Sequence, residues 1–258
     1  MQRFFHPFRL LESLTYVPRI DIIEKMKDLF KSLSKFEIFL WAFSVIVLIV
    51  TFIVSPNKDY INLSASLIGV TSLIFIAKGK YFGQILMIAF ALLYSVISLL
   101  FKYYGELITY AGMSLPMAVV SLIKWIKHKS DSAEEVEVSS TKRSHILILF
   151  SLTAAVTVAF YFILGALGNA NLIFSTLSVA TSFLAAGLTC LRNRFYALAY
   201  CANDVVLIVL WSLASYEDLS YLTMVVCFAV FLINDIYGFI NWTRMKKRQA
   251  KENLSPGE

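Results

Sequence analysis

Charged residues are scarce in this chain, and they are unevenly placed. Only 16% of the 258 residues are Asp, Glu, Lys or Arg, whereas 59% are hydrophobic and the mean hydropathy is +0.72. A soluble chain of this length needs a more polar surface. The charges fall between apolar runs of about 18 or more residues, which indicate membrane-spanning helices rather than the short alternating segments of a β-barrel. The composition therefore predicts an all-α membrane protein.

The residues and motifs of several chemistries are also missing. No GxxxxGK, HExxH or GxSxG motif occurs, so a P-loop ATPase and the usual metalloprotease and hydrolase signatures are excluded. The three histidines lie at one end or in loops, and no metal cluster is expected. The cysteines lie within apolar runs without CxxC spacing, as buried inert thiols do: Cys190, Cys201 and Cys227. We expect no enzyme, no cofactor and no metal site.

Eight apolar runs are long enough to cross a bilayer. They cover about residues 36–54, 60–77, 81–101, 105–126, 145–165, 171–190, 194–213 and 219–242. At 1.5 Å per residue, some 20 helical residues span a hydrocarbon core of about 30 Å. The runs therefore predict eight transmembrane helices.

The connections between these runs alternate in charge, which predicts the orientation of the chain. One set is strongly basic: the N-terminal lysines, 78–80, 124–143, 192–194 and 244–251. The other set is neutral to acidic: 57–59, 102–106, 168–171 and 217–218. The positive-inside rule places both termini in the cytoplasm, and the net charge of +6 indicates this topology rather than nucleic-acid binding.

Residues 1–35 predict an amphipathic segment on the cytoplasmic side. Apolar residues recur there at helical spacing between lysines: Ile22, Ile23, Met26, Leu29, Phe30 and Leu33. Such a helix would lie on an anionic membrane surface. A frayed terminal tail is the alternative.

The spans repeat in groups of three. Residues 77–81 (Ala-Lys-Gly-Lys-Tyr) resemble residues 191–195 (Leu-Arg-Asn-Arg-Phe), and Trp125 and Trp242 each precede a basic exit. This pattern predicts two parallel repeats related by an axis along the membrane normal, an arrangement typical of transporters that bind substrate between two bundles near mid-membrane. The predicted units are an extra span at 36–54, a first repeat at 60–126, a loop at 127–144, a linker span at 145–165, a second repeat at 171–242 and a basic tail at 243–258.

Two Asn-Asp pairs lie inside apolar runs, Asn203-Asp204 and Asn234-Asp235. A carboxylate at the bilayer centre costs about 2.5 to 3.5 kcal/mol on insertion scales, so each needs water, a protein partner or a ligand. We interpret the pairs as part of a polar binding site or pathway. The alternative is hydrogen bonding that only joins helices.

Aromatic residues share the helical stripe of the first pair, namely Tyr200 and Trp211. Aromatic rings beside amides and carboxylates favour a neutral or cationic ring compound that carries hydroxyls. Asp235 lies near the basic connections, so its alternative role is an ion pair with Arg192 or Arg194.

The first repeat is less polar and offers fewer candidates. These are Gln84, Tyr94, Glu106, Tyr110 and Ser114. Tyr110 and Ser114 share a helical face, whereas solvation at the outer edge alone would explain Glu106. Pro116 predicts a kink, either beside a cavity or within ordinary packing.

Segments of both repeats resemble the Pnu vitamin transporters, also called the nicotinamide mononucleotide transporter family. The resemblance covers roughly residues 60–245 and rests on 65–80, Leu93-Tyr94-Ser95, 104–110, 115–117 with Trp125, 192–204 and 234–242. It implies a fold like that of the SWEET sugar transporters. It also implies facilitated diffusion of nicotinamide riboside across a bacterial cell membrane, trapping by a cytosolic kinase, and compatibility with a homotrimer.

The resemblance also suggests roles for the candidate residues. Tyr200 would stack on the ring of the substrate, and Asn203 with Asp204 would bind its hydroxyls or amide. The remaining substrate-binding candidates are Gln84, Tyr110, Trp211, Asn234 and Asp235.

The chain departs from the family pattern at the ring-binding positions. The family signature Trp-x-x-Trp-x-x-x-Asn/Asp, aligned through Asp204, has Ala197 and Tyr200 in place of tryptophan. An Asn common four residues before Tyr94 is Phe90. Thiamine, riboflavin and deoxynucleosides therefore remain alternative substrates. Proton-coupled transport through Asp204 or Asp235, and a non-transporting subunit or receptor, remain alternative functions.

Overall fold

The computed structural model describes residues 27–55, 58–100, 104–130, 135–169 and 171–252, in two compact units, Met1–Phe39 and Leu40–Glu258. In the first unit, Ser34 and Glu37 form a capping box at the start of helix α3 (Lys35–Val54). The Ser34 N–H donates to the Glu37 carboxylate at 2.6 Å, and the Glu37 N–H donates to the Ser34 hydroxyl at 3.3 Å. Of the expected amphipathic helix, residues 1–26 lie outside the described residues.

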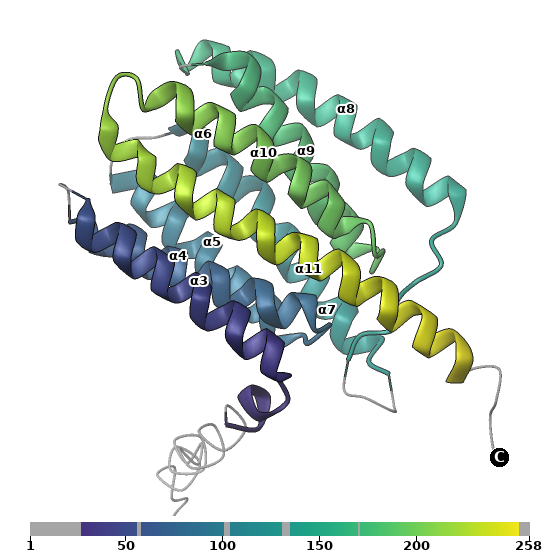
Figure 1. The fold of residues 1–258 in the computed structure, drawn as a ribbon. Helices are drawn as coiled ribbons and strands as arrows, with labels where there is room; N and C mark the ends of the chain where they lie inside the picture. Colours follow the sequence, from purple (N-terminus) through teal and green to yellow (C-terminus); the bar gives the residue numbers. More distant parts are fainter. Residues whose placement is uncertain (1–26, 56–57, 101–103, 131–134, 170, 253–258) are drawn as a thin grey trace, which may run out of the picture. The chain divides into compact units, whose positions relative to one another are not determined.

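The described part of the chain contains eight helices that are long and apolar enough to cross a membrane. This finding confirms the predicted all-α membrane protein with eight transmembrane helices. They are α3, α4 (Tyr60–Ala77), α5 (Phe82–Leu100), Tyr104–Lys127, α8 (Arg143–Ala166), α9 (Leu172–Cys190), α10 (Tyr196–Ala214) and α11 (Leu222–Glu252) (Figure 1). The fourth span consists of α6 (Tyr104–Leu107), a π-helix (Ile108–Ser114) and α7 (Leu115–Lys127). A short 3₁₀ turn, Leu219–Tyr221, precedes α11.

Helix α11 is longer than the predicted span. The sequence pattern ended the last span at Trp242 and assigned residues 243–258 to a tail, whereas α11 continues to Glu252. Met245 and Gln249 are buried on this extension, so packing at its surface holds the added turns in place. The basic residues there are good helix formers that extend a helix already begun.

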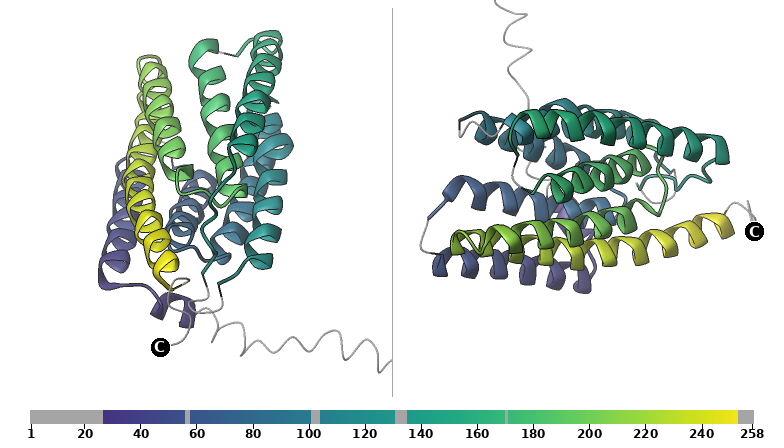
Figure 2. Two further views of the ribbon diagram at one scale, coloured as in Figure 1. Left: turned by 90° about the vertical axis from the view of Figure 1, so that its right-hand side faces the viewer. Right: turned by 90° about the horizontal axis from the view of Figure 1, so that it is seen from above.

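The helices of the second unit pack as two related three-helix bundles would. The first predicted bundle consists of α4, α5 and the fourth span, and the second consists of α9, α10 and α11. Helix α5 contacts both α4 and α7, and α10 contacts both α9 and α11. Between the bundles, α4 packs against α11 and α7 packs against α9, while α8 lies along α9 (Figures 1 and 2). The first helix of each predicted repeat thus contacts the last helix of the other, which favours the predicted two-fold relation.

The turns α4–α5 and α9–α10 have the same hydrogen-bond pattern. Gly79 and Arg192 both have positive φ, +71° and +54°, and each N–H donates to a carbonyl three residues back. The next N–H, of Lys80 or Asn193, donates five residues back, as in a Schellman motif. Gly79 is therefore the counterpart of Arg192, so the expected match of residues 77–81 with 191–195 was wrong by one residue.

Two tryptophans connect the bundles reciprocally. The indole N–H of Trp125, in α7, donates to the Thr189 carbonyl of α9 at 3.1 Å. The indole N–H of Trp242, in α11, donates to the Ile76 carbonyl of α4 at 2.9 Å. Because each bond runs from the end of one predicted repeat to the first helix of the other, the pair is arranged as a local two-fold axis would require.

Candidate functional site

A cavity of about 680 Å³ lies among the helices of the second unit. Asp59, Gly168 and Glu217 line it and belong to connections at one end of the helices, which we call the cavity end. The opposite end, with the turns at Gly79 and Arg192, is here called the basic end. The cavity therefore lies at the end remote from the α4–α5 and α9–α10 turns. Its volume suits a drug-sized or nucleoside-sized ligand.

Aromatic side chains form part of the cavity wall. The rings of Tyr94 (α5) and Tyr110 (the π-helix) lie 4.8 Å apart between centroids, with their planes 31° from parallel. Phe90 packs against Tyr94 at 4.7 Å. Elsewhere in the lining, Trp211 and Tyr221 are 5.3 Å apart. These faces can stack on a planar ligand ring.

The π-helix brings Tyr110 to this wall. Pro116 follows it in the first turn of α7 and has no N–H, so the regular α-helical hydrogen bond is missing at this point. The Leu115 N–H instead donates to the Tyr110 carbonyl, five residues back. Thr109 and Tyr110 both line the cavity, so the predicted disruption by Pro116 lies beside a cavity. π-Helical turns are often found at functional sites.

Two of the predicted site residues, Tyr110 and Trp211, line the cavity. The others do not line it: Gln84, Tyr200, Asn203, Asp204, Asn234 and Asp235. On α10, the lining residue Leu207 lies one turn from Asp204, on the cavity side. The second group therefore occupies a layer deeper in the protein, toward the basic end, which we call the polar layer.

Two phenylalanines lie between cavity-lining residues and polar-layer residues along their helices, and we call them the floor. Phe231 lies between Phe228 and Asn234 on α11, and Phe90 lies between Tyr94 and Gln84 on α5. Gly69 lies one turn beyond the lining residue Ser66 on α4, and a Cβ placed on it would come within 2.8 Å of Phe231 and 3.1 Å of Phe90. The two rings thus close over this glycine, which cannot be replaced by alanine without displacing one of them. Phe90, the position at which the family commonly has Asn, belongs to this floor.

Some hydrogen bonds of the polar layer join helices. Asn203 accepts from the Thr181 hydroxyl at 2.9 Å, and Asn234 donates to the Ser44 hydroxyl at 3.0 Å. Asp204 and Asp235 lie on the contacting helices α10 and α11 and are both buried, at 3% and 4% exposed. Within the described residues Asp235 forms no ion pair with Arg192 or Arg194, and Arg192 instead pairs with Glu137 at 3.5 Å.

Other polar atoms of this layer have no partner within the described structure. They are Gln84 Nε2, Asp204 Oδ2 and Asn234 Oδ1, on residues that are 2%, 3% and 1% exposed. A buried polar group left without a hydrogen bond costs about 1 to 3 kcal/mol. Helix-joining bonds explain one part of the layer, but these three atoms need a water molecule or a ligand as partner.

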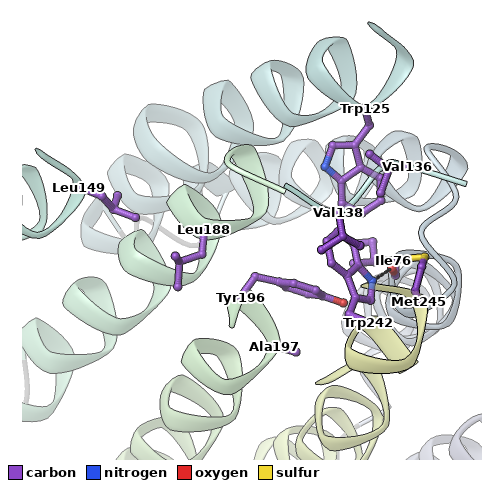
Figure 3. Close-up of a cluster of buried hydrophobic side chains, with 10 residues drawn as sticks. All are labelled: Ile76, Trp125, Val136, Val138, Leu149, Leu188, Tyr196, Ala197, Trp242 and Met245. Atoms are coloured by element: carbon purple, nitrogen blue, oxygen red, sulfur yellow. Dashed lines mark hydrogen bonds between the residues drawn. The ribbon is translucent and has the colours of Figure 1, made fainter. Parts of the chain in front are cut away.

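The basic end is packed shut by a cluster of large side chains (Figure 3). The rings of Trp125 and Trp242 lie 5.4 Å apart, and Tyr196 packs on Trp242 at 4.7 Å. All three are at most 1% exposed. Ala197, at the first tryptophan position of the family signature, lies in the same cluster, so this position is packed at the basic end and not in the cavity.

A segment between α7 and α8, residues 135–141, ties this end together, and we call it the strap. The Val136 N–H donates to the Gly79 carbonyl at 2.8 Å, and the Ser139 N–H donates to the Arg192 carbonyl at 3.0 Å. Gln249 of α11 accepts from the Val138 N–H and donates to the Glu135 carboxylate and the Val136 carbonyl. The strap thus bonds to both equivalent turns and to the extension of α11.

Membrane-spanning helices that enclose a polar and aromatic cavity at one end and pack tightly at the other are typical of a membrane transporter. The family model for the nicotinamide mononucleotide transporter matches residues 59–244, and the chain belongs to that family. It is a multi-pass membrane protein of a transporter family, not of an enzyme family.

Named relatives are similar over most of their length. The nicotinamide riboside transporter PnuC of Neisseria mucosa is 26% identical over 230 residues, which cover 87% of both chains. The protein of the same name from Haemophilus influenzae is 24% identical over 215 residues, covering 83% of this chain and 92% of the relative. A crystal structure of the vitamin B3 transporter PnuC superposes with a TM-score of 0.71 at 25% identity, covering 84% of this chain and 94% of that one.

Sequence reasoning missed several polar residues of the cavity. They are Asp59, the N-cap of α4, and Asn62 and Ser66 within α4. Their spacing of three and four residues places them on one face of the helix start, and this polar stripe was the available signal. Tyr94 and Glu106, which the sequence offered only as secondary candidates, also line the cavity.

Proposed function

We propose that this chain carries nicotinamide riboside, or a closely related vitamin or nucleoside, across the bacterial plasma membrane by facilitated diffusion. Family membership and the printed names of the relatives support the substrate class. The observation that carries the proposal is the cavity of about 680 Å³, whose aromatic and polar lining suits a planar ring that carries hydroxyls.

In the proposed pathway, substrate enters at the cavity end and first meets Tyr110 and Trp211. The polar layer is the next stage, where Tyr200 would stack on the ring and Asn203 with Asp204 would bind hydroxyls or the amide. Gln84, Asn234 and Asp235 complete this layer. The unpartnered atoms on Gln84, Asp204 and Asn234 support a role in ligand binding, because ligand groups would satisfy them.

Passage requires two barriers to open in turn. The floor formed by Phe90 and Phe231 separates the cavity from the polar layer, and the tryptophan cluster with the strap closes the basic end. We propose that the two three-helix bundles rock about the polar layer. The basic end would face the cytoplasm, with both chain termini on that side. A cytosolic kinase would trap the substrate there, and the protein would assemble as a homotrimer.

A proton-coupled mechanism is the second candidate, and the Asp204–Asp235 pair favours it. Two buried carboxyl groups on contacting helices can share a proton, because burial disfavours two negative charges side by side. Release of that proton to one side of the membrane would couple transport to a pH gradient. Uptake into vesicles with and without an imposed pH gradient separates the two mechanisms: facilitated diffusion requires the same equilibrium accumulation in both.

Uptake into liposomes tests the proposed function. The purified protein is reconstituted, and entry of labelled nicotinamide riboside is measured in competition with thiamine, riboflavin, thymidine and deoxyadenosine. Saturable entry that only unlabelled nicotinamide riboside reduces is the expected result. Stronger competition by another compound would change the substrate. Entry of none of them, together with no thermal stabilisation by any, would favour the non-transporting subunit.

A further inference from the structure

The charges in the cavity lining are all of one sign. Asp59, Glu106 and Glu217 line the cavity, and the described lining contains no Lys, Arg or His. A cavity with low-dielectric walls concentrates the field of such charges and attracts ligands of opposite sign. The protein as a whole is basic, so this local acidity runs against the net charge of +6.

The three carboxylates differ in what they already bind. Asp59 caps α4, accepting from the N–H groups of Ile61 and Asn62. Glu217 is exposed at the edge of the cavity. Glu106 is partly buried and has no hydrogen-bond or ion-pair partner among the described residues. Of the three, Glu106 is therefore the carboxylate that remains available to a ligand inside the cavity.

Two tyrosines accompany this carboxylate. Glu106 and Tyr110 lie four residues apart in the fourth span and line the cavity together with Tyr94, whose ring is stacked on that of Tyr110. Tyr94 is only 8% exposed, yet its hydroxyl has no hydrogen-bond partner among the described residues and is not among the fully enclosed polar atoms. Since Tyr94 lines the cavity, its hydroxyl is reached from there.

We propose that Glu106, Tyr94 and Tyr110 form a subsite for a positively charged aromatic ring, such as an N-ribosylated pyridinium, within the cavity. The proposal rests on the proposed transport function and assigns its charge selectivity. Tyrosine faces attract a ring cation through their quadrupole, and Glu106 supplies the opposite charge. The Asn-Asp residues of the polar layer are separated from this subsite by Phe90 and Phe231, so recognition of the ring charge precedes their engagement.

The effect of the ring charge on binding can be measured with two ligands of the same shape. Benzamide riboside has carbon where nicotinamide riboside has its ring nitrogen, so it lacks the positive charge. Binding of each is measured by calorimetry on the full-length protein in lipid nanodiscs. We expect the unmodified protein to prefer nicotinamide riboside about tenfold, as a partly screened ion pair with cation–π contact would give. Glu106→Gln is expected to bring the two affinities within about twofold of each other.

Matched variants locate the effect. Glu217→Gln removes the same charge at the cavity edge and should keep the preference, and Glu106→Asp, which retains the carboxylate, should keep most of it. Tyr110→Phe should preserve the preference, whereas Tyr110→Leu should reduce it. An equal preference in Glu106→Gln and the unmodified protein, or an equal loss in Glu217→Gln, would overturn the subsite.

The same variants separate this proposal from the proposed function. If no substrate enters liposomes but the Glu106-dependent preference persists in binding, the transport function fails and the subsite stands. If nicotinamide riboside enters and the preference does not depend on Glu106, the function stands and the subsite fails. Thermal unfolding of each variant shows whether it is folded, and Glu106→Ala, which also removes the charge, takes the place of Glu106→Gln if the latter unfolds.

Discussion

The two ends of the second unit are built from the same helices, yet one encloses a cavity and the other is packed shut. At the cavity end, helix connections leave carboxylates, amides and tyrosine faces around a space of about 680 Å³. At the basic end, Trp125, Trp242 and Tyr196 fill the centre, and the strap bonds to both equivalent turns. The helices are therefore held together by specific contacts at the basic end, which leaves the cavity end free to accept a ligand.

The polar layer lies between these two ends, and substitutions there are expected to have the largest effect on uptake. Asp204→Ala is expected to lower uptake about 10- to 150-fold, because it removes a buried group whose hydrogen bonds to a polar ligand contribute about 1.5 to 3 kcal/mol. Uptake into liposomes measures the loss. Asp204→Asn keeps the shape and should retain more activity if hydrogen bonding rather than charge is required.

The helix-joining alternative makes the opposite prediction for the same residue. If Asp204 only joins helices, Asp204→Ala lowers the melting temperature and no small ligand raises it in either form. Ligand-dependent stabilisation follows mass action, so the melting temperature at saturating substrate distinguishes a ligand-binding Asp204 from one that only joins helices. Unchanged uptake by Asp204→Ala would remove this residue from the pathway.

Loss of the strap should destabilise the basic end. Gln249→Ala removes the side chain that accepts from Val138 and donates to Glu135 and Val136. We expect a loss of about 2 to 3 kcal/mol in the free energy of unfolding, since buried groups are left unpartnered. Denaturant unfolding in detergent measures it. Lys247→Ala, two residues away on the exposed face of α11, is the matched control and should change little.

The two tryptophan bonds test the two-fold relation between the bundles. Trp125→Phe and Trp242→Phe each remove one indole donor from a buried carbonyl, of Thr189 or Ile76. Each should cost about 1 to 2 kcal/mol, and the two losses should be similar because the bonds are equivalent. Thermal unfolding of both variants makes the comparison. A large loss for one and none for the other would show that the bundles do not share the closure equally.

The smallest effect is expected at the cavity wall. Pro116→Ala restores an N–H donor after the π-helix and favours a regular α-helix, which would turn Thr109 and Tyr110 away from the cavity. Uptake should fall about threefold while stability stays the same or rises slightly, in line with the cost of a proline in a helix. Substrate affinity measured beside uptake shows whether Tyr110 has moved. An unchanged affinity would mean that the π-helix does not position the wall.

The eight spans could be predicted because membrane helices need long apolar runs. The connections between them could be placed because they carry most of the charged residues. The register of the repeat could not be predicted, since Gly79 and Arg192 share a left-handed conformation that glycine signals and arginine does not. The cavity was harder still to predict. Asp204 and Asn234 stood out as buried polar residues, whereas Asn62 and Ser66 lie near a helix end, where polar residues are ordinary.

The depth of the Asn-Asp pairs also depended on contacts that no local pattern contains. Phe90 and Phe231 come from different helices and close over Gly69 of a third, and the pairs do not line the cavity. Similarly, the end of the last helix depended on the strap, whose partners Gly79, Arg192 and Gln249 are distant in the sequence.

Accessibility along a single helix shows whether the molecule is open at one end and closed at the other. Leu210 and Ala197 both belong to α10, but Leu210 lines the cavity and Ala197 is fully buried at the basic end. Leu210→Cys and Ala197→Cys are compared in a protein whose native cysteines are replaced by alanine and whose uptake is intact. Without substrate, a small water-soluble thiol reagent should modify position 210 readily and position 197 very slowly, and nicotinamide riboside should protect position 210. Equal modification of both positions in the absence of substrate would contradict a molecule that is open at one end and closed at the other.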